Sequence, residues 1–373
     1  MYGSETEITL TPFNFTVDHV TSYPTETNVL PLLIDQQVIY VQKNKRKVRE
    51  IAYKIKIGDT NATDLTLRAD NISIKNIEQI VYQDMPNNIV WCRMGDGKLT
   101  AMTYNQSLQM SAWSNHVIGG TDVVVESLAV IPTTTHDQLW MIIKRTINTN
   151  TVRYIEFMDR FYDSGYLNSD DAHFVDSGVY DEVGAVTGVF TVNTSTEVIT
   201  SSGHDRITDD VIQVSSATTL PGGLVASTNY WIHKIDANTF KLKPNSSTTL
   251  DFVDITTTGT GVHTWTLKRK RTIPVTHLKN ESLRILSDSS LQNNKTVDGT
   301  TGDIIMDLAG AKVHAGLAFD SYITTLDLAE GPTGILVGNR KKIHRIVIKM
   351  LDTMGVKFGP TIDDLDEVIF RFP

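Results

Sequence analysis

The chain of 373 residues contains a single cysteine, Cys92. One cysteine excludes an intramolecular disulfide and a zinc site built from several thiolates of one subunit. We expect Cys92 to fill space in the core. No stretch approaches the ~20 consecutive apolar residues of a membrane span. The first residues, 1–5, also lack the basic and apolar regions of a secretory signal, so we expect a soluble chain without a visible export signal.

Positive charge is scarce as well. The chain has 34 Lys and Arg against 43 Asp and Glu, a net charge of −9 at pH 7. A protein that wraps duplex DNA uses clustered Lys and Arg side chains to displace counterions from the phosphates. The acidic net charge argues against such a DNA-wrapping surface. It does not argue against a surface past which DNA slides. The basic clusters lack interleaved aromatic residues for base stacking, which favours solvated turns over nucleic-acid contacts. These clusters are Lys43, Lys45, Arg46 and Lys47; residues 268–271; and Arg340, Lys341 and Lys342.

Helix signals are rare, and strand signals dominate. β-branched and aromatic runs of about four to eight residues end at Gly, Asn, Asp or Pro. Two stretches, 77–104 and 125–158, repeat one pattern of three strands with a tryptophan on the middle strand, at about the ~40 to 50 residue period of propeller blades. We therefore predict an all-β fold of propeller-like antiparallel blades, with Trp91 and Trp140 at equivalent core positions. A short helical turn is expected at 64–71.

The composition changes inside the chain. Between Val186 and Leu267 the sequence is rich in Thr, Ser, Val and Gly with hardly any Arg, and the flanking pattern resumes afterwards. This change predicts an inserted β-domain. We divide the chain into residues 1–185, the first part of a propeller-like region; 186–267, the insertion; and 268–373, the second part. The ends of the insertion should lie close together, and its removal should leave the remainder folded.

Residue types found in active sites occur, but not in the required patterns. Ser201, Ser202, His204 and Asp205 supply the groups of a hydrolase triad, yet no nucleophile-elbow pattern surrounds either serine. Asp170, Asp171 and His173 could form part of a metal site, although one histidine near carboxylates is more typical of a surface loop. The acidic residues Asp363, Asp364, Asp366 and Glu367 lack the spacing and central glycine of an EF-hand.

Two glycine-rich segments, 95–97 and 259–261, precede no expected helix, as a phosphate-binding loop would. Both fit hairpin turns, where glycine adopts a positive φ without strain. We therefore assign no catalytic, cofactor-binding or metal-binding residue, and we expect no enzymatic activity.

Several motifs of the chain, taken in order, carry a family resemblance. They are 41–42 with 48–53, 64–67, 90–93 with 96–104, 112–113 with 119–120, 125–132, 139–140, 153–157 and 314–319. Together they cover most of the chain outside 186–267, and their order is more specific than any single motif. They resemble the tail nozzle proteins of short-tailed bacteriophages, also called tail tubular protein B. The segment 186–267, with motifs at 220–224, 230–232, 236–242 and 259–263, is similar to the FCCH-like small β-domains of phage genomes, without implied ubiquitin chemistry.

The resemblance implies a β-propeller-containing virion protein that is made in the host cytoplasm and forms a ring, commonly hexameric, at the distal end of a short tail. DNA would leave through the centre during host entry. Partners would be other copies of the chain, an adaptor ring and tail fibres, with no membrane span and no cofactor. Members of the family usually extend upstream of Met1 and downstream of Phe372, so we expect this chain to be a portion of a longer protein.

Two other classes of function stay open. The first is a receptor- or glycan-binding tail component whose insertion uses Tyr230 and Trp231, although strand alternation allows only one of the two to face solvent. The second is a propeller-fold glycosidase, which would need two facing carboxylates. A DNA conduit needs no catalysis, and it should offer few well-placed cations because each phosphate contact retains the DNA. The acidic net charge of the chain fits that requirement.

Overall fold

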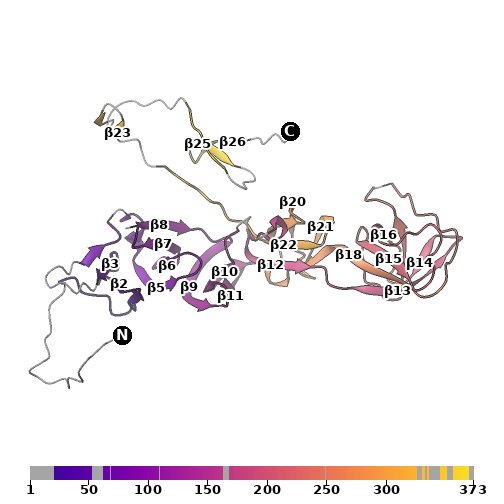
Figure 1. Ribbon diagram of the computed structural model, residues 1–373, viewed down its shortest axis with the longest axis horizontal. Coiled ribbons are helices and arrows are strands. Elements are labelled where there is room, and N and C mark those ends of the chain that lie inside the picture. Colours follow the sequence, from indigo (N-terminus) through magenta and orange to yellow (C-terminus); the bar gives the residue numbers. More distant parts are fainter. Residues whose placement is uncertain are drawn as a thin grey trace, which may run out of the picture. The chain divides into compact units, whose positions relative to one another are not determined.

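The computed structural model describes residues 21–52, 62–67, 69–108, 110–162, 168–247, 249–325, 330–331, 334–335, 345–350 and 356–368. Within these ranges the protein is all-β, as predicted, with antiparallel strands and no α-helix (Figure 1). The helical elements are three short 3₁₀ helices, η1 (Ser73–Lys75), η2 (Ser169–Asp171) and η3 (Thr276–Leu278). The prediction of a helical turn at 64–71 is wrong, because the described residues there form no helix and lead through turns into η1.

The chain divides into two units. Met1–Phe161 and Ser169–Asp320 belong to the larger unit, and Tyr162–Asn168 and Ser321–Pro373 belong to the smaller one. The described part of the smaller unit contains two hairpins. Their strands are β23 (Glu330–Gly331) with β24 (Gly334–Ile335), and β25 (Lys357–Thr361) with β26 (Asp364–Glu367). Among the described residues, no helix has the length and apolar character needed to cross a membrane.

Three consecutive sheets form the first part of the larger unit (Figure 1). The first consists of β1 (Leu32–Ile34), β2 (Gln37–Val41), β3 (Val48–Ala52) and β4 (Ala62–Asp64). The second consists of β5 (Ile77–Gln83), β6 (Ile89–Met94), β7 (Leu99–Asn105) and β8 (Met110–His116). The third consists of β9 (Thr121–Pro132), β10 (Asp137–Ile147) and β11 (Asn150–Phe157). Both predicted three-stranded repeats are therefore confirmed, as β5 to β7 and as β9 to β11.

The inner strands of the β5–β8 sheet, β6 and β7, are buried on both faces. Since successive strand residues point to opposite faces, the apolar run of β6 supplies two cores. On one face Val90 and Cys92 join a core with residues of the β1–β4 sheet, such as Ile39 and Val48. On the other face Trp91 joins a core with five residues of the β9–β11 sheet, namely Val125, Leu128, Leu139, Met141 and Ile143. Burial raises the pKa of the Cys92 thiol to about 12, so the thiol is neutral core filler, as expected.

The two tryptophans are not equivalent. Trp91 is fully buried, and its indole N–H donates to Gln83 Oε1 at 2.8 Å. Trp140 also lies on the middle strand of its sheet, but on the face opposite to Leu139 and Met141, beside Phe157 at 5.2 Å between ring centroids. That face is solvent-accessible, because Phe157 is 48% exposed. The expectation of equivalent core positions is therefore wrong for Trp140.

A fourth sheet follows, with strand order β12 (Asp176–Glu182), β22 (Lys312–Leu317), β19 (Ser282–Ser287) and β20 (Ser290–Thr296). Its core also receives Ile147 of β10 and residues of β21 (Asp303–Gly310). Arg145, which is fully buried, lies at the junction with the β9–β11 sheet. Its Nε donates to Gly119 O at 2.9 Å, and its guanidinium binds both carboxylate oxygens of Glu156. The Gly119 N–H in turn donates to Asp176 at 2.6 Å, so one polar network connects the two sheets.

A closed six-stranded barrel occupies the region predicted as an insertion. Its strands, in order around the barrel, are β13 (Thr187–Asn193), β14 (Val198–Thr200), β17 (Thr239–Lys243), β16 (Tyr230–Lys234), β15 (Val211–Ser216) and β18 (His263–Pro274). Pairing of β18 with β13 closes the barrel around Phe190, Ile212, Phe240 and Trp265. The ends of the predicted insertion meet, because Leu267 N donates to Val186 O at 2.8 Å. Strand β18 nevertheless continues past Leu267 and pairs with β21.

Candidate functional site

A groove of about 510 Å³ lies on the barrel where β13 changes partner. Residues 187–190 of β13 pair with β18, whereas residues 191–193 pair with β14. The groove lies at this interruption of the strand pairing. Its lining consists of Val189, Phe190, Thr191, Val192, Thr200, Ser201, Ser202, Thr258, Gly261, Val262 and His263.

The groove presents hydroxyl and aliphatic groups. No Asp, Glu, Lys or Arg is among its described lining residues. Val189 and Val262 are 65% and 61% exposed. His263 is buried, with Nδ1 at 3.0 Å from Ser216 Oγ and Nε2 at 3.0 Å from Thr258 O. Because both ring nitrogens hold neighbouring segments in place, the groove suits binding of a neutral polar ligand better than acid–base chemistry.

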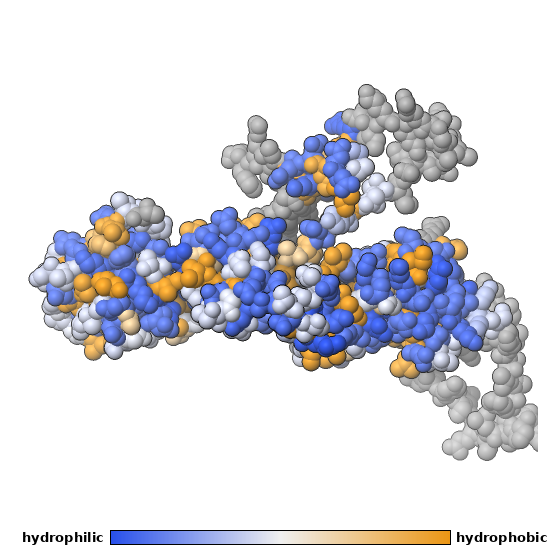
Figure 2. All heavy atoms as spheres, turned by 180° about the vertical axis from the view of Figure 1, so that it is seen from behind, coloured by the Kyte–Doolittle hydropathy of each residue, from blue (hydrophilic) through white to orange (hydrophobic). Residues whose placement is uncertain are grey.

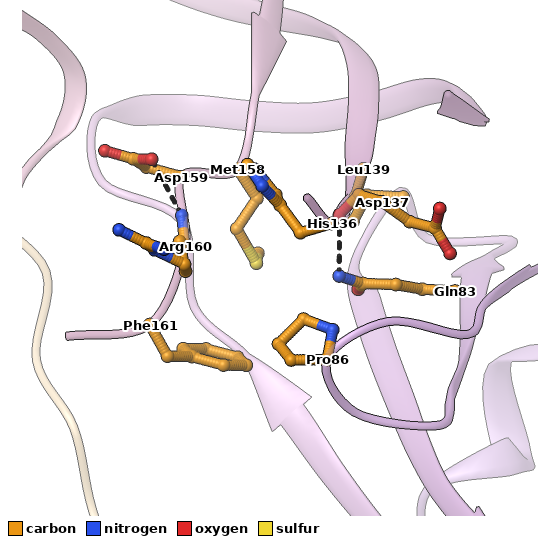
Figure 3. A pocket seen from close by; sticks show the side chains of 9 residues that line it. All are labelled: Gln83, Pro86, His136, Asp137, Leu139, Met158, Asp159, Arg160 and Phe161. Carbon is orange, nitrogen blue, oxygen red and sulfur yellow. Dashed lines mark hydrogen bonds between the residues drawn. The ribbon is translucent and has the colours of Figure 1, made fainter. Parts of the chain in front are cut away.

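A second, enclosed cavity lies between the β5–β6 turn, the start of β10 and the segment after β11 (Figure 3). Its volume is about 10 Å³, which is room for one water molecule at most. The Gln83 side chain crosses its edge and donates to Asp137 O at 2.9 Å. The side chains in Figure 3 therefore pack three segments together and leave no space for a substrate.

The structure does not assemble a triad from Ser201, Ser202, His204 and Asp205. His204 is buried, and burial lowers the pKa of its imidazole. Its Nδ1 accepts a hydrogen bond from Arg206 N at 3.0 Å, and its Nε2 donates to Asp236 O at 3.1 Å. Ser201 Oγ accepts the indole N–H of Trp265 at 2.9 Å. Both ring nitrogens of His204 are thus already bonded and cannot take a proton from a serine.

Asp170, Asp171 and His173 lie beside the fourth sheet, against strand β22. Lys312 Nζ lies 2.7 Å from Asp171 and 3.8 Å from Asp170. His173 Nδ1 lies 2.8 Å from Nδ1 of His314 on β22. The histidines are 141 positions apart, and no spacing in the sequence relates them. Within the described ranges, no group of three or more His, Cys, Asp or Glu side chains is arranged to hold a metal ion.

The acidic residues 363–367 belong to the hairpin of β25 and β26, where Asp364 and Asp366 pair with Thr361 and Phe358. Their side chains are exposed. Of the two glycine-rich segments, 95–97 forms the expected hairpin turn, whereas 259–261 does not connect two paired strands. Gly97 has φ of +79° in the turn between β6 and β7. Gly259 and Gly261 have φ of +67° and +87° on either side of Thr260, which pairs with Thr219 in an isolated bridge.

Basic residues of two predicted clusters are engaged in local ion pairs. Lys45 Nζ lies 2.7 Å from Glu78, and Lys47 Nζ lies 3.2 Å from Asp64. In the second cluster, Lys270 pairs with Asp181 at 2.7 Å and Arg271 with Asp209 at 3.2 Å. Arg269 pairs with Asp288 at 3.4 Å. In these ion pairs the carboxylates neutralise the positive charges, which a nucleic-acid-binding surface would keep available for phosphates. The third cluster, Arg340, Lys341 and Lys342, lies outside the described residues.

Tyr230 and Trp231 point to opposite sides of the barrel wall. Tyr230 is buried in the barrel core, and its hydroxyl accepts a hydrogen bond from Val225 N at 2.9 Å. Trp231 is half-buried. Tyr230 is therefore unavailable to a glycan, and the platform of two aromatic side chains considered from the sequence does not form.

One apolar surface stands out on the β9–β11 sheet, and sequence analysis missed it. Strand register places its side chains on the face opposite to the buried core. We call this surface the open face; its members are Ile131, Trp140, Ile142, Ile155 and Phe157. Ile155 is 72% exposed, and Ile131 is 47% exposed. Figure 2 shows that hydrophobic residues gather in separate groups on the visible side of the molecule, among hydrophilic ones.

No protein-family model matches the chain, and a search of curated proteins gives no match.

Proposed function

We propose that this protein is a structural component of a bacteriophage tail, of the nozzle or tubular type, that forms part of the conduit for DNA ejection and acts without catalysis. In the virion, copies of the chain form a ring, which is commonly hexameric in the family that the motifs resemble. The ring contacts other tail proteins, such as an adaptor ring and fibres. The ordered motifs in the sequence and the all-β fold support this proposal.

The observation that carries the proposal is the stack of three sheets that ends in the open face. Two apolar cores lie between consecutive sheets, one on each side of the β5–β8 sheet. The open face presents the same kinds of side chain to solvent. Propeller blades pack face to face in this way, so we interpret the sheets as propeller-like blades and residues 186–267 as an inserted domain. A contact between the open face and a different surface of the next copy could close into a ring.

Charge distribution also supports a passive conduit. The net charge is −9, and several basic side chains already pair with carboxylates of the same chain. A wall with few available cations gives each phosphate little salt-dependent attraction, so DNA can pass without being retained.

Assembly of the purified chain tests the proposal. We expect light scattering to give the mass of a closed oligomer and electron microscopy to show rings that match density at the tip of the particle's tail. Ile155→Lys should strongly reduce the assembled fraction, since it places a charge on the open face without disturbing a buried core. Val189→Lys, at a similarly exposed position of the barrel, is the matched control and should assemble normally.

Two results would overturn the proposal. One is a tail map in which no density fits the three-sheet stack. The other is cleavage of a polysaccharide or peptidoglycan by the purified chain, with loss of that activity on replacement of one carboxylate while the fold stays intact.

The groove favours a second candidate, a receptor- or glycan-binding tail component. Its hydroxyl-rich lining, including Thr191 and Thr200, offers hydrogen bonds to a neutral sugar. A glycan array probed with the purified chain tests this candidate. Thr191→Tyr, which fills the groove, should abolish binding, whereas Ser195→Tyr in an exposed turn of the same barrel should not. Equal binding by both variants would place the glycan elsewhere.

A further inference from the structure

A short segment, residues 169–175, is held on strand β22 by polar contacts; we call it the strap. Lys312 of β22 forms an ion pair with Asp171 at 2.7 Å. His314 Nε2 lies 3.1 Å from the carbonyl oxygen of Asp170. His173 Nδ1 lies 2.8 Å from His314 Nδ1. Histidine nitrogens therefore form two of the contacts between the strap and the fourth sheet.

These contacts determine the protonation of both rings. A carbonyl oxygen only accepts, so His314 must carry its proton on Nε2. The Nδ1 atom of a neutral His314 is then an acceptor, and His173 must donate to it from its own Nδ1. The two neutral rings consequently hold opposite tautomers, with Nδ1–H on His173 and Nε2–H on His314.

While the strap is attached, the pair can hold only one additional proton. A first proton on His173 Nε2 leaves the bond between the rings intact. A second proton must go to His314 Nδ1, where it removes the only acceptor of that bond and places two N–H groups against each other. The interacting rings thus share one titration while the strap is attached, whereas two separated rings would titrate independently.

The surroundings keep both rings in place. His314 is 5% exposed, and its ring lies 4.9 Å from the ring of Tyr180 on β12. A Cβ atom on Gly178 would lie 2.7 Å from His173 Nε2, so the His173 ring packs directly on the β12 backbone. The titratable and charged groups around the pair are Asp159, Asp170, Asp171, Tyr180, Glu182, Asp288 and Lys312.

We propose that the His173–His314 pair is a pH-sensitive latch, which holds the strap on β22 at neutral pH and releases it when both rings become protonated. The carboxylates of Asp159 and Asp171 favour charge on the pair, but they cannot restore the lost acceptor. Release of the strap would break the bond to Asp170 as well, because the two contacts share the His314 ring.

The direction of the pH dependence follows from proton binding. Burial is the largest cause that lowers the pKa of His173 and of His314, and the neighbouring His314 lowers that of His173 further. In the released form the two rings are separated, so the pKa of each moves toward the value of about 6.5 of a free histidine. Below that value the released form binds more protons than the attached form, so the attachment is strongest above pH 6.5 and weakens as pH falls through the lowered pKa values.

Hydrogen exchange of the full chain, followed by mass spectrometry and corrected for intrinsic rates, measures the release. Between pH 7.5 and 5.5 we expect the opening constant of peptides that cover the strap to rise about tenfold. The double variant His173→Gln/His314→Gln has no titrating ring, and its strap should open to the same extent at both pH values. The test compares how strap opening changes with pH, so it stays decisive even if the strap of the variant opens more at every pH. His233→Gln, on the barrel, is the matched control and should keep the wild-type response.

Selective ¹⁵N labelling of histidine gives an independent readout. At neutral pH we expect opposite tautomers for His173 and His314, with midpoints of titration below 6.5. Equal tautomers, or a strap whose protection depends on pH equally in the wild type and in the double variant, would overturn the latch. Neither result would bear on the proposed role in a phage tail, which does not depend on this pair.

Discussion

At the scale of single residues, burial separates Trp91 from Trp140. We expect Trp91→Ala to lower the free energy of unfolding by ~3 to 5 kcal/mol, because it leaves a cavity between two sheets. This is a large part of a typical stability of about 5 to 15 kcal/mol. Trp140→Ala should cost about 1 kcal/mol, since that indole is half-buried on the open face. Urea unfolding measures both, and equal losses would contradict the assignment of Trp140 to the open face.

Two arginines provide a second comparison at this scale. Arg145 is fully buried and bonds Gly119 and Glu156, whose side chain is 16% exposed, so Arg145→Ala leaves a mostly buried carboxylate without its partner and should cost ~3 to 5 kcal/mol. Arg153 also pairs with a glutamate, Glu126, at 2.8 Å, but its side chain is 58% exposed. Solvent screens this exposed pair, so Arg153→Ala should lower the free energy of unfolding far less than Arg145→Ala. Denaturant midpoints of the two variants test this; a cost for Arg145→Ala as small as that for Arg153→Ala would be incompatible with the network.

At the scale of elements, strand β18 belongs to two structures. Its first half closes the barrel, and its second half pairs with β21. Arg271 on this strand also bonds the barrel loop, since its backbone N–H donates to Asp210 at 2.9 Å. The barrel nevertheless has its own core, and its chain ends meet at Val186 and Leu267.

We therefore expect that replacing residues 186–267 by a short Gly/Ser linker leaves the remainder folded. Calorimetry should show one cooperative unfolding transition for the shortened chain, at a somewhat lower temperature because the contacts of Arg271 with the barrel loop are lost. The segment expressed alone should also unfold cooperatively. A remainder that melts without a cooperative transition would show that the barrel is needed to complete the fold.

At the scale of the whole molecule, buried histidines make stability depend on pH. Burial lowers the pKa of His116, which contacts Trp91 edge to face, and of His204 in the barrel. Unfolded histidines titrate near 6.5, so the unfolded chain takes up more protons below that pH. Burial instead raises the pKa of Asp176 and Asp210, and the resulting stabilisation is present at low pH and lost as pH rises from 3.8 through their raised values.

The free energy of unfolding should therefore be highest above pH 6.5 and should decrease from pH 7.5 to pH 5.5. Denaturant titrations at several pH values measure this slope. His116→Phe removes one of the responsible groups and should reduce the slope, whereas replacing Lys98, which is exposed, by Gln should not. A wild-type stability that does not change across this interval would contradict the expectation.

The sequence by itself determined the local elements of this protein. Alternating apolar residues and turn residues located the strands of both three-stranded repeats, because strand period and turn preference are properties of neighbouring residues. The change in composition between Val186 and Leu267 likewise located the segment that contains most of the barrel.

Only the tertiary structure decided which surfaces are covered and which distant residues meet. Trp91 and Trp140 occupy similar places in the two repeats, but packing on a neighbouring sheet buries one and leaves the other on the open face. The groove forms where β13 changes partner, and His173 meets His314 across 141 positions. These features depend on contacts between segments far apart in the chain, so no local pattern of residues could predict them.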